Sequence, residues 1–407
     1  MTRAGIGFIV GGVVLYLLGV QTQIGWFYLV DALVWSMVAL SAFIPWWSLR
    51  GLRIERQVLL PHSADRLREV ASPREDETVE VRLRVSNGGR LARHFVKVVE
   101  GCPLEGPDAR PRVFLLSALK ARSSLSFSYV ATCYRRGRYT SAWATLETAA
   151  PMGIFIRRRR FDLPLRVTIY PAYYRMEGTP VATEAWSEQG QAVRASAASE
   201  FYGSREYRHG DPLRHIHWRN TARLGQFVVK EFEQASQASV AVAFETRRDW
   251  GAGRDTTLEY SIRIAASLAR RCADLGQSIG ILAGQAPLLR ADWPEAMDYL
   301  AGLEVGETTS LEEMAVTTQP GQTLVVIAPA AETDLIPSLR HLAGRERRLV
   351  VVLLEGFIQG ERPQEFLSQL GRDSGLLVRC ARGELTVALE TLGRSWLSSD
   401  QLPVTAG

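Results

Sequence analysis

Two long apolar segments near the N-terminus most strongly constrain how this chain can fold. They cover residues 4–20 and 26–47, and only Asp31, two serines and Pro45 interrupt the second one. The hydrocarbon core of a bilayer is about 30 Å thick, so a helix needs roughly 20 apolar residues to cross it, with about 17 as the lower limit. Both segments therefore predict transmembrane helices, which the short uncharged turn 21–25 would join.

The residues that flank these segments predict their orientation. Aromatic side chains stand at both ends of the second segment, as they do at membrane interfaces. Arg3 precedes the first segment and three arginines follow the second at positions 50, 53 and 56, so the positive-inside rule places both termini in the cytoplasm. A cleaved signal peptide is the alternative, but no small-residue cleavage site separates the segments. We therefore expect residues 1–50 to form a transmembrane helical hairpin in the inner (cytoplasmic) membrane.

The remaining composition is that of a globular protein with more than one domain. The chain has 407 residues, of which 46% are hydrophobic and 22% charged, and its net charge is only +5. Four isolated cysteines, at positions 102, 133, 272 and 380, form no C-x-x-C pair. A cytoplasmic location would keep them reduced, and we interpret them as small buried hydrophobic residues.

Alternating polarity predicts an all-β sandwich over residues 51–178. Residues 78–85 alternate strictly between apolar and polar side chains, and the turn 87–89 follows them. Further short apolar segments cover residues 95–99, 113–116, 125–131 and 139–147. The run of four arginines at 157–160 has two interpretations, a solvated loop or a contact with the anionic inner leaflet.

Residues 236–400 predict an α/β domain with a doubly wound parallel sheet. Continuous apolar strands alternate with amphipathic helices there, as in parallel sheets that are covered on both faces. The expected strands are 240–244, 279–283, 323–328, 349–354 and 376–379, and the expected helices are 258–272, 335–342, 363–370 and 385–396. Asp334 is the expected N-cap of the second helix. A linker without clear periodicity begins at residue 179.

The segment 200–233 is the strongest candidate for a functional or interdomain site. It contains three histidines, five arginines, one lysine and five acidic residues. Its arginines could bind carboxylates or phosphates of a partner through two parallel hydrogen bonds, or they could form a solvated face with internal salt bridges. Interleaved acidic residues weaken the field that a nucleic-acid-binding surface needs, so we expect no nucleic acid partner.

Fixed residues in this segment resemble those of the bacterial Domain of Unknown Function 58 family. The matching positions are Phe201, Arg205, Glu206, Tyr207, Gly210, Asp211, Arg214, Ile216, Trp218, Thr221, Ala222 and Arg223. Upstream, Arg136-Gly137-Arg138-Tyr139 and Pro151-Met152-Gly153-Ile154-Phe155 extend the resemblance. The resemblance implies that the α/β domain is similar to a von Willebrand factor type A domain and that the partner is a MoxR-type AAA+ ATPase.

From these residues we predict a partner-binding segment within 179–235. Its expected contact residues are Arg205, Glu206, Tyr207, Gly210, Asp211, Arg214, Trp218, Arg219 and Arg223. A structural role is the alternative: Asp211 would cap a helix whose first turn holds Pro212, and Ile216 and Trp218 would belong to the core. On this interpretation the chain is a membrane-anchored cytoplasmic adaptor, with no catalytic residues and no cofactor.

The competing hypothesis is a hydrolase or a metal-dependent enzyme that uses His209, Asp211, His215 and His217. On a strand, His215 and His217 would share one face, but on the helix that Asp211-Pro212 predicts they would point apart. The chain has no Walker A, G-x-S-x-G or H-E-x-x-H motif.

A metal site of the type A kind is also not expected. Such domains often bind Mg²⁺ through a D-x-S-x-S motif after the first strand. Here Glu245, Arg247 and Asp249 occupy the three motif positions, and an arginine among the ligands would repel a cation. We therefore predict no metal at this position.

Overall fold

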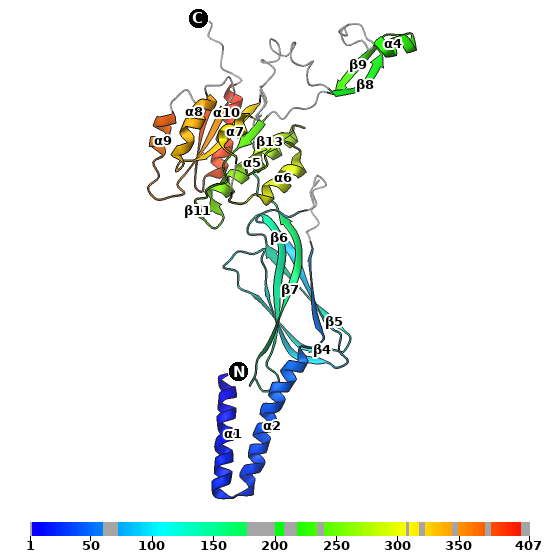
Figure 1. Ribbon diagram of the computed structural model, residues 1–407, viewed down its shortest axis with the longest axis vertical. Helices are drawn as coiled ribbons and strands as arrows, with labels where there is room; N and C mark the ends of the chain where they lie inside the picture. Colours follow the sequence, from blue (N-terminus) through cyan, green and yellow to red (C-terminus); the bar gives the residue numbers. More distant parts are fainter. Residues whose placement is uncertain are drawn as a thin grey trace. The chain divides into compact units, whose positions relative to one another are not determined.

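A computed structural model describes residues 2–59, 72–176, 200–206, 218–233, 240–306, 309–316, 322–343, 349–370 and 376–399. The chain divides into two compact units, Met1–Tyr170 and Pro171–Gly407 (Figure 1). The first unit holds two long helices and two antiparallel sheets, and the second holds a mixed α/β sheet and a separate hairpin.

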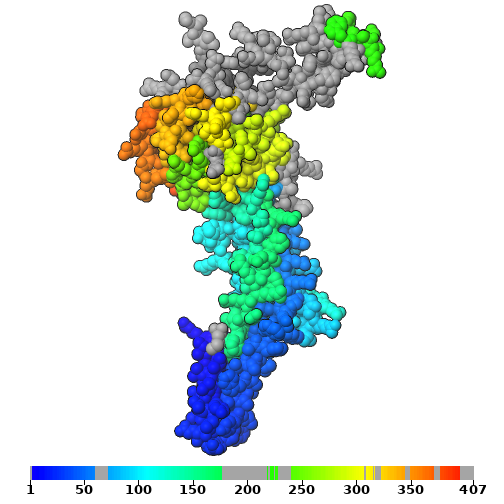
Figure 2. Space-filling view, in the orientation of Figure 1, coloured from blue at the N-terminus to red at the C-terminus, as the bar shows by residue number. Residues whose placement is uncertain are grey.

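The two N-terminal apolar segments form the helices α1 (Arg3–Thr22) and α2 (Gly25–Ser48). Each is long and apolar enough to cross a membrane, and most of its surface is uncovered within the unit (Figure 2). Glycines allow the helices to approach each other closely: a Cβ atom at Gly12 would lie 3.2 Å from Trp35 Nε1. The side chain of Thr2 caps α1 by accepting a hydrogen bond from the Gly5 amide.

The following strands form a two-sheet β-sandwich, as predicted. One sheet has the order β1-β2-β5 and the other has the order β4-β3-β6-β7, and all described pairs are antiparallel. The strands are β1 (Leu52–Leu59), β2 (Thr78–Asn87), β3 (Arg93–Gly101), β4 (Arg112–Leu119), β5 (Ser124–Thr132), β6 (Gly137–Thr148) and β7 (Arg157–Ile169). Val79, Val81, Leu83 and Val85 point into the core between the sheets, as their alternation predicts.

The four-arginine run is not a loop, which corrects one of our two interpretations of it. Residues 157–160 begin β7 and pair with residues 145–148 of β6. The arginine side chains are exposed, and β7 is an edge strand of its sheet. Charged side chains are common on edge strands because they oppose pairing with another chain, while the backbone ladder forms regardless of side-chain charge.

The second unit contains a six-stranded sheet of order β14-β13-β10-β15-β16-β17. Its strands are β10 (Val240–Ala243), β13 (Ile279–Leu282), β14 (Leu288–Ala291), β15 (Thr323–Pro329), β16 (Leu349–Glu355) and β17 (Leu376–Ala381). Five strands are parallel, as predicted, and only the edge strand β14 is antiparallel.

Helices cover the sheet, in agreement with a doubly wound arrangement (Figure 1). The helices are α5 (Thr257–Asp274), α6 (Trp293–Gly302), α7 (Leu311–Val316), α8 (Ile336–Ala343), α9 (Pro363–Leu370) and α10 (Leu385–Ser399). Side chains of α7, α8 and α9 share one buried cluster with alternate residues of the strands, while α5 and α10 contact each other. Asp334 is not the N-cap of α8, because it lies inside the short 3₁₀ turn Thr333–Leu335 that precedes the helix.

A separate hairpin carries part of the candidate partner-binding segment. β8 (Glu200–Glu206) pairs with β9 (Val228–Glu233), and the short helix α4 (Trp218–Leu224) lies between them in sequence.

Three cysteines are buried as predicted, and burial raises the pKa of the Cys133, Cys272 and Cys380 thiols to about 12. Cys102 is only half-buried.

Candidate functional site

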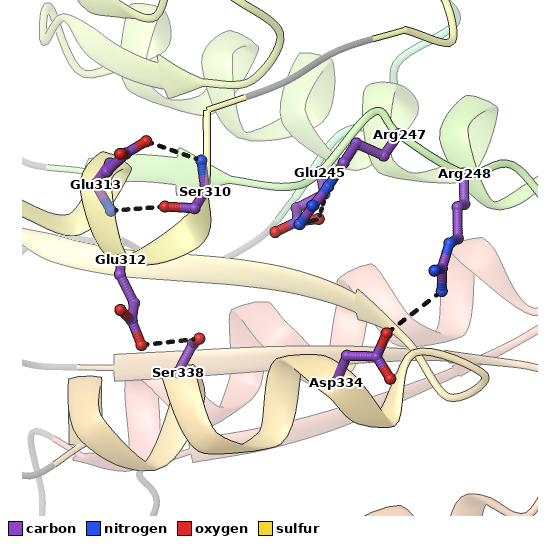
Figure 3. Close-up of polar contacts among 8 residues, drawn as sticks. All are labelled: Glu245, Arg247, Arg248, Ser310, Glu312, Glu313, Asp334 and Ser338. Carbon is purple, nitrogen blue, oxygen red and sulfur yellow. Dashed lines mark hydrogen bonds and ion pairs between the residues drawn. The ribbon is translucent and has the colours of Figure 1, made fainter.

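The best-defined polar site of the second unit lies where the strand order of the parallel sheet reverses. β10 and β15 are neighbours in the sheet. The chain continues from β10 to β13 on one side and from β15 to β16 on the other, so the connections after β10 and β15 leave in opposite directions. In open α/β sheets, ligands bind outside the carboxyl ends of the strands at such a switch point. Here the segment that follows β10 and the segment that follows β15 bring charged residues to the same edge (Figure 3).

An intramolecular ion pair occupies the end of β10. Arg247 Nε and Nη2 donate hydrogen bonds of 2.8 and 2.6 Å to the same Glu245 oxygen, Oε2 (Figure 3). The Glu245 side chain is only 4% exposed, whereas the Arg247 side chain is 55% exposed. The glutamate is thus held at the base of the site, and the guanidinium that neutralises it keeps an open face toward solvent. The hydrogen bond to Glu245 raises the pKa of Arg247.

Glu332, which follows β15, adds a buried carboxyl group to the same edge. Its pKa is raised to about 7, chiefly by burial and then by the negative charge of Glu245, against the opposing effects of Arg248 and Arg247. Arg248 Nη1 lies 3.4 Å from Asp334 Oδ2 and links the β10 segment to the β15 segment. The site therefore combines two arginines with a carboxyl group that titrates near neutral pH.

The neighbouring acidic residues of α7 are engaged in helix contacts. The Glu313 amide donates a 3.3 Å hydrogen bond to Ser310 Oγ, and the Ser310 amide donates one of the same length to Glu313 Oε2 (Figure 3). Ser338 Oγ donates a 3.1 Å bond to Glu312 Oε1 and so connects α7 with α8. These contacts fix the rim of the site and leave Arg247 and Arg248 as its exposed cations.

The residues at the type A motif positions do not fit a divalent cation. Arg247 donates to Glu245, and Asp249 Oδ1 accepts hydrogen bonds from the Leu258 amide (2.9 Å) and Thr257 Oγ1 (3.2 Å), at the start of α5. Asp249 therefore stabilises the N-terminus of a helix. Within the described ranges, no three His, Cys, Asp or Glu residues are grouped closely enough to hold a metal ion. The absence of metal binding stays a prediction.

The structure places only part of the predicted partner-binding segment. Arg205 and Glu206 end β8, while Trp218, Arg219 and Arg223 belong to α4. Trp218 is 66% exposed, so our alternative interpretation of it as a core residue is wrong; a helix of seven residues has little surface to bury a large ring. Arg223 is exposed as well. Residues 207–217 lie outside the described residues, and with them the other candidate residues of the segment: Tyr207, His209, Gly210, Asp211, Arg214, His215, Ile216 and His217.

The charged cluster around Glu332 was not predicted from the sequence. Glu332 and Asp334 follow the apolar strand β15, just as Glu245 follows β10. Charged residues directly after two predicted parallel strands were the one signal in the sequence that could have indicated this site. Sequence alone gave no indication that these two strands are neighbours.

Comparison with protein families gives one match. Residues 203–377 match the model of a family described as "Protein of unknown function DUF58". No curated protein matches the chain. This confirms the resemblance that the fixed residues of the segment 200–233 indicated.

Solved structures resemble the chain only slightly. A β-glucosidase from Erythrobacter marinus is 13% identical, with 28% of this chain and 15% of that chain covered and a TM-score of 0.14. A cycloisomaltooligosaccharide glucanotransferase from Paenibacillus sp. is 11% identical, with 76% and 51% covered and a TM-score of 0.16. A GH20 exo-β-N-acetylglucosaminidase from Vibrio harveyi is 8% identical, with 84% and 75% covered and a TM-score of 0.21. The chain thus spans about half or less of the first two structures, and none of these similarities indicates a fold or a function.

Proposed function

Since residues 203–377 place this chain in the DUF58 family, we propose that it is a membrane-anchored adaptor that recruits a MoxR-type AAA+ ATPase. The two N-terminal helices would hold both folded units at the cytoplasmic face of the inner membrane. The segment 200–233 and the switch-point site would provide the docking surface. The process served would be envelope-related or the assembly of a complex.

The observation that carries this proposal is the continuity between the apolar hairpin and the folded body. α2 ends at Ser48 and β1 begins at Leu52. Leu49 and Leu52, at this junction, are both buried in the core of the sandwich. Because no flexible linker separates the last helical turn from the first strand, an anchor in the membrane would fix the position of the sandwich as well.

The second unit supports the finer part of the proposal, a domain similar to von Willebrand factor type A domains. Its mixed sheet is built largely from parallel strands, and Glu245 follows β10 at the motif position. Arg247 supplies the positive charge that a divalent cation would otherwise bring to that position. An adaptor of this kind would bind its partner through side-chain charges and would not need a metal ion.

The alternative of a hydrolase or metal-dependent enzyme depends on His209, Asp211, His215 and His217. These four residues lie outside the described part of the chain. No contact among the described residues favours this alternative over the adaptor.

A co-purification experiment tests the adaptor proposal. The full chain is extracted from membranes in detergent, and the recovered MoxR-type ATPase is measured for wild type, Arg219→Ala and Arg219→Lys. If Arg219 contacts a carboxylate of the partner, its removal from a desolvated pair costs about 2–5 kcal/mol, which is enough to lose a micromolar complex. Lysine cannot replace the paired hydrogen bonds of a guanidinium, so Arg219→Lys should also weaken recovery.

The matched control is Arg362→Ala, because Arg362 is a highly exposed arginine directly before α9 in the same unit. All variants are compared by thermal melting to confirm that they are folded. Equal recovery of the ATPase with all four folded proteins would move the docking surface away from α4. Failure of the wild type to recover the ATPase would contradict the adaptor function itself.

A further inference from the structure

One end of the β-sandwich carries a surface that the proposed docking function does not use. The strands of unit Met1–Tyr170 are joined at this end by three loops, 88–92, 120–123 and 149–156, which we call the helix-proximal loops. At the opposite end, the described loops are 72–77, 102–111 and 133–136, which we call the helix-distal loops. The two ends differ in charge and in exposed apolar side chains.

The helix-proximal end is predominantly basic, although Glu147, beside the loop 149–156, accepts a 2.8 Å hydrogen bond from Arg158 Nε. Its exposed basic residues are Arg50, Arg53, Arg90, His94, Lys120, Arg122, Arg157 and Arg158. The three loops contain no aspartate or glutamate, and neither do residues 48–53 or 93–95. The helix-distal loops have mixed charge, with five acidic residues, Glu75, Asp76, Glu77, Glu105 and Asp108, beside four arginines, Arg74, Arg110, Arg135 and Arg136. The basic charge is therefore a property of one end and does not follow from the composition of the domain.

Large apolar side chains are exposed among these basic residues. Leu91, Phe95, Met152 and Ile156 all lie in or next to the helix-proximal loops, and the Phe95 side chain is 61% exposed. Phe95 also has a φ of +53°, a backbone conformation that bulky residues rarely adopt. An exposed aromatic residue in an unfavourable conformation, among basic side chains, is unusual for a surface that contacts only water.

Hydrogen bonds hold this surface at the ends of the two apolar helices. Thr2 Oγ1 donates a 2.7 Å bond to the Gly153 carbonyl, and the Thr2 amide donates a 3.1 Å bond to the Ile154 carbonyl. Arg93 Nη2 donates to the Arg50 carbonyl at 3.2 Å, and its guanidinium lies 4.2 Å from the ring centre of Trp47. The start of α1 is thus attached to a helix-proximal loop, and the end of α2 to the first residue of β3, which directly follows another such loop.

Helix length then determines where the loops lie relative to a bilayer. α1 has 20 residues, and at 1.5 Å per residue it is about 30 Å long, which equals the hydrocarbon thickness of about 30 Å. The whole helix is needed to cross this thickness, so Thr2 must lie at its boundary. The headgroup layer adds roughly 5–7 Å on each side, and the loop bonded to Thr2 falls within that layer.

We propose that the helix-proximal end of the sandwich is a binding surface for anionic phospholipid headgroups. Leu91, Phe95, Met152 and Ile156 insert at the level of the headgroups, and the surrounding arginines and Lys120 contact their phosphates. This proposal rests on the membrane anchoring in the proposed function and adds a lipid class to it. Bound anionic lipids would restrain the sandwich against the membrane in addition to the two helices.

Amide hydrogen exchange of the full-length protein in lipid nanodiscs tests the proposal. One set of discs contains phosphatidylcholine alone, and in the other about a quarter of the lipid is phosphatidylglycerol. Each basic residue near an anionic surface contributes roughly a fivefold factor in affinity. The amides of residues 88–95 and 149–156 should therefore exchange about fivefold more slowly in the anionic discs. The helix-distal loops should exchange equally in both. Equal exchange of the helix-proximal loops in the two lipids would overturn the proposal.

A pair of matched variants identifies the charges responsible. The first carries Arg90→Gln, Lys120→Gln, Arg122→Gln and Arg157→Gln, and the second carries Arg82→Gln, Arg110→Gln, Arg138→Gln and Arg166→Gln. Both lose four positive charges, but only the first loses them at the helix-proximal end. The first should lose the lipid-dependent protection and the second should keep it, while exchange of the β2 amides and of residues 96–101 in β3 shows that each is folded. Equal loss in both variants would contradict a site of this kind.

Carbonate extraction separates this proposal from the anchoring on which it rests. Wild-type protein that stays in carbonate-washed membranes but shows no lipid-dependent exchange overturns only the lipid-binding surface. Protein that carbonate releases would contradict the anchoring and the lipid-binding surface together. Recovery of the ATPase is measured independently of both results.

Discussion

The β-sandwich and the α/β unit each hold a glutamate against an arginine, but in opposite surroundings. In the sandwich, Arg56 Nη1 lies 3.4 Å from Glu100 Oε1, and the two side chains are 1% and 0% exposed. At the edge of the parallel sheet, Arg247 Nη2 lies 2.6 Å from Glu245 Oε2, and more than half of the arginine side chain is exposed. An arginine–glutamate ion pair therefore occurs twice, once fully buried inside a domain and once partly exposed to solvent.

Burial determines what each pair can do. In the sandwich, both charges have left water, so each depends on the other, and loss of one leaves an uncompensated buried charge. At the sheet edge, Arg247 retains contact with solvent and can meet a partner without unfolding the domain. We infer that Arg56 and Glu100 serve the fold, whereas the switch-point residues are the ones available for function.

The largest predicted effect is the loss of one member of the buried pair. Glu100→Leu leaves the Arg56 guanidinium buried and unpaired, which should lower the free energy of unfolding of the sandwich by about 3–5 kcal/mol. The double variant Arg56→Met with Glu100→Leu removes both charges and should recover most of this loss. Urea unfolding of the detergent-solubilised full chain, followed by exchange of the β2 and β3 amides, measures both. A double variant as unstable as the single one would show that the pair itself stabilises the fold.

The second prediction concerns the pH dependence of the α/β unit. Glu332 has an ordinary pKa of 4.5 and a folded-state pKa of about 7, so between these values the folded unit binds more protons than the unfolded chain. Stability should therefore fall as pH rises through this window, by at most about 3 kcal/mol, and stay level above it.

Exchange protection of the β10 and β15 amides between pH 5 and pH 8, corrected for intrinsic exchange, gives the measurement for Glu332. Glu332→Gln cannot ionise, so it should flatten the profile and raise stability at pH 8. The exposed Glu390→Gln is the matched control and should leave the profile unchanged. An unchanged profile in Glu332→Gln would assign the pH dependence to another group.

The smallest predicted effect belongs to the exposed pair Arg248–Asp334. Both side chains are more than half exposed, so the ion pair should contribute no more than about 0.5 kcal/mol to the free energy of unfolding. A double-mutant cycle with Arg248→Ala and Asp334→Ala, measured by the same amides, gives the coupling directly. A coupling well above 1 kcal/mol would mean that this edge of the sheet is more rigid than its exposure indicates.

Sequence patterns predicted the elements whose burial follows a local period. Val79, Val81, Leu83 and Val85 are fully buried because a strand alternates its side chains between two faces. The continuous apolar strands of the parallel sheet were equally visible. The strand over residues 157–160 was not, because its pairing with β6 depends on backbone groups, while the arginines on it indicated either a solvated loop or a contact with the membrane.

Two further features were missed for different reasons. Helix α6 begins with a capping box between Asp292 and Glu295, which is a local signal that the sequence contains. The contact between Arg248 and Asp334 has no local signal, because it requires β10 and β15 to be neighbours although they are some 80 residues apart in sequence. Sites at a switch point depend on topology and become visible only after the strand order is known.

The central claim is that α1 and α2 cross the membrane and leave both folded units in the cytoplasm. Labelling of intact cells with a membrane-impermeant thiol reagent tests it most directly. The variants are Thr22→Cys at the C-terminal end of α1 and Ala109→Cys in an exposed loop of the sandwich, and the wild-type chain gives the background from its four native cysteines. We expect Thr22→Cys to be labelled from outside, and Ala109→Cys to be labelled only after the cells are permeabilised. Labelling of Ala109→Cys in intact cells, with Thr22→Cys protected, would contradict the cytoplasmic location of the folded units and the ATPase partnership that depends on it.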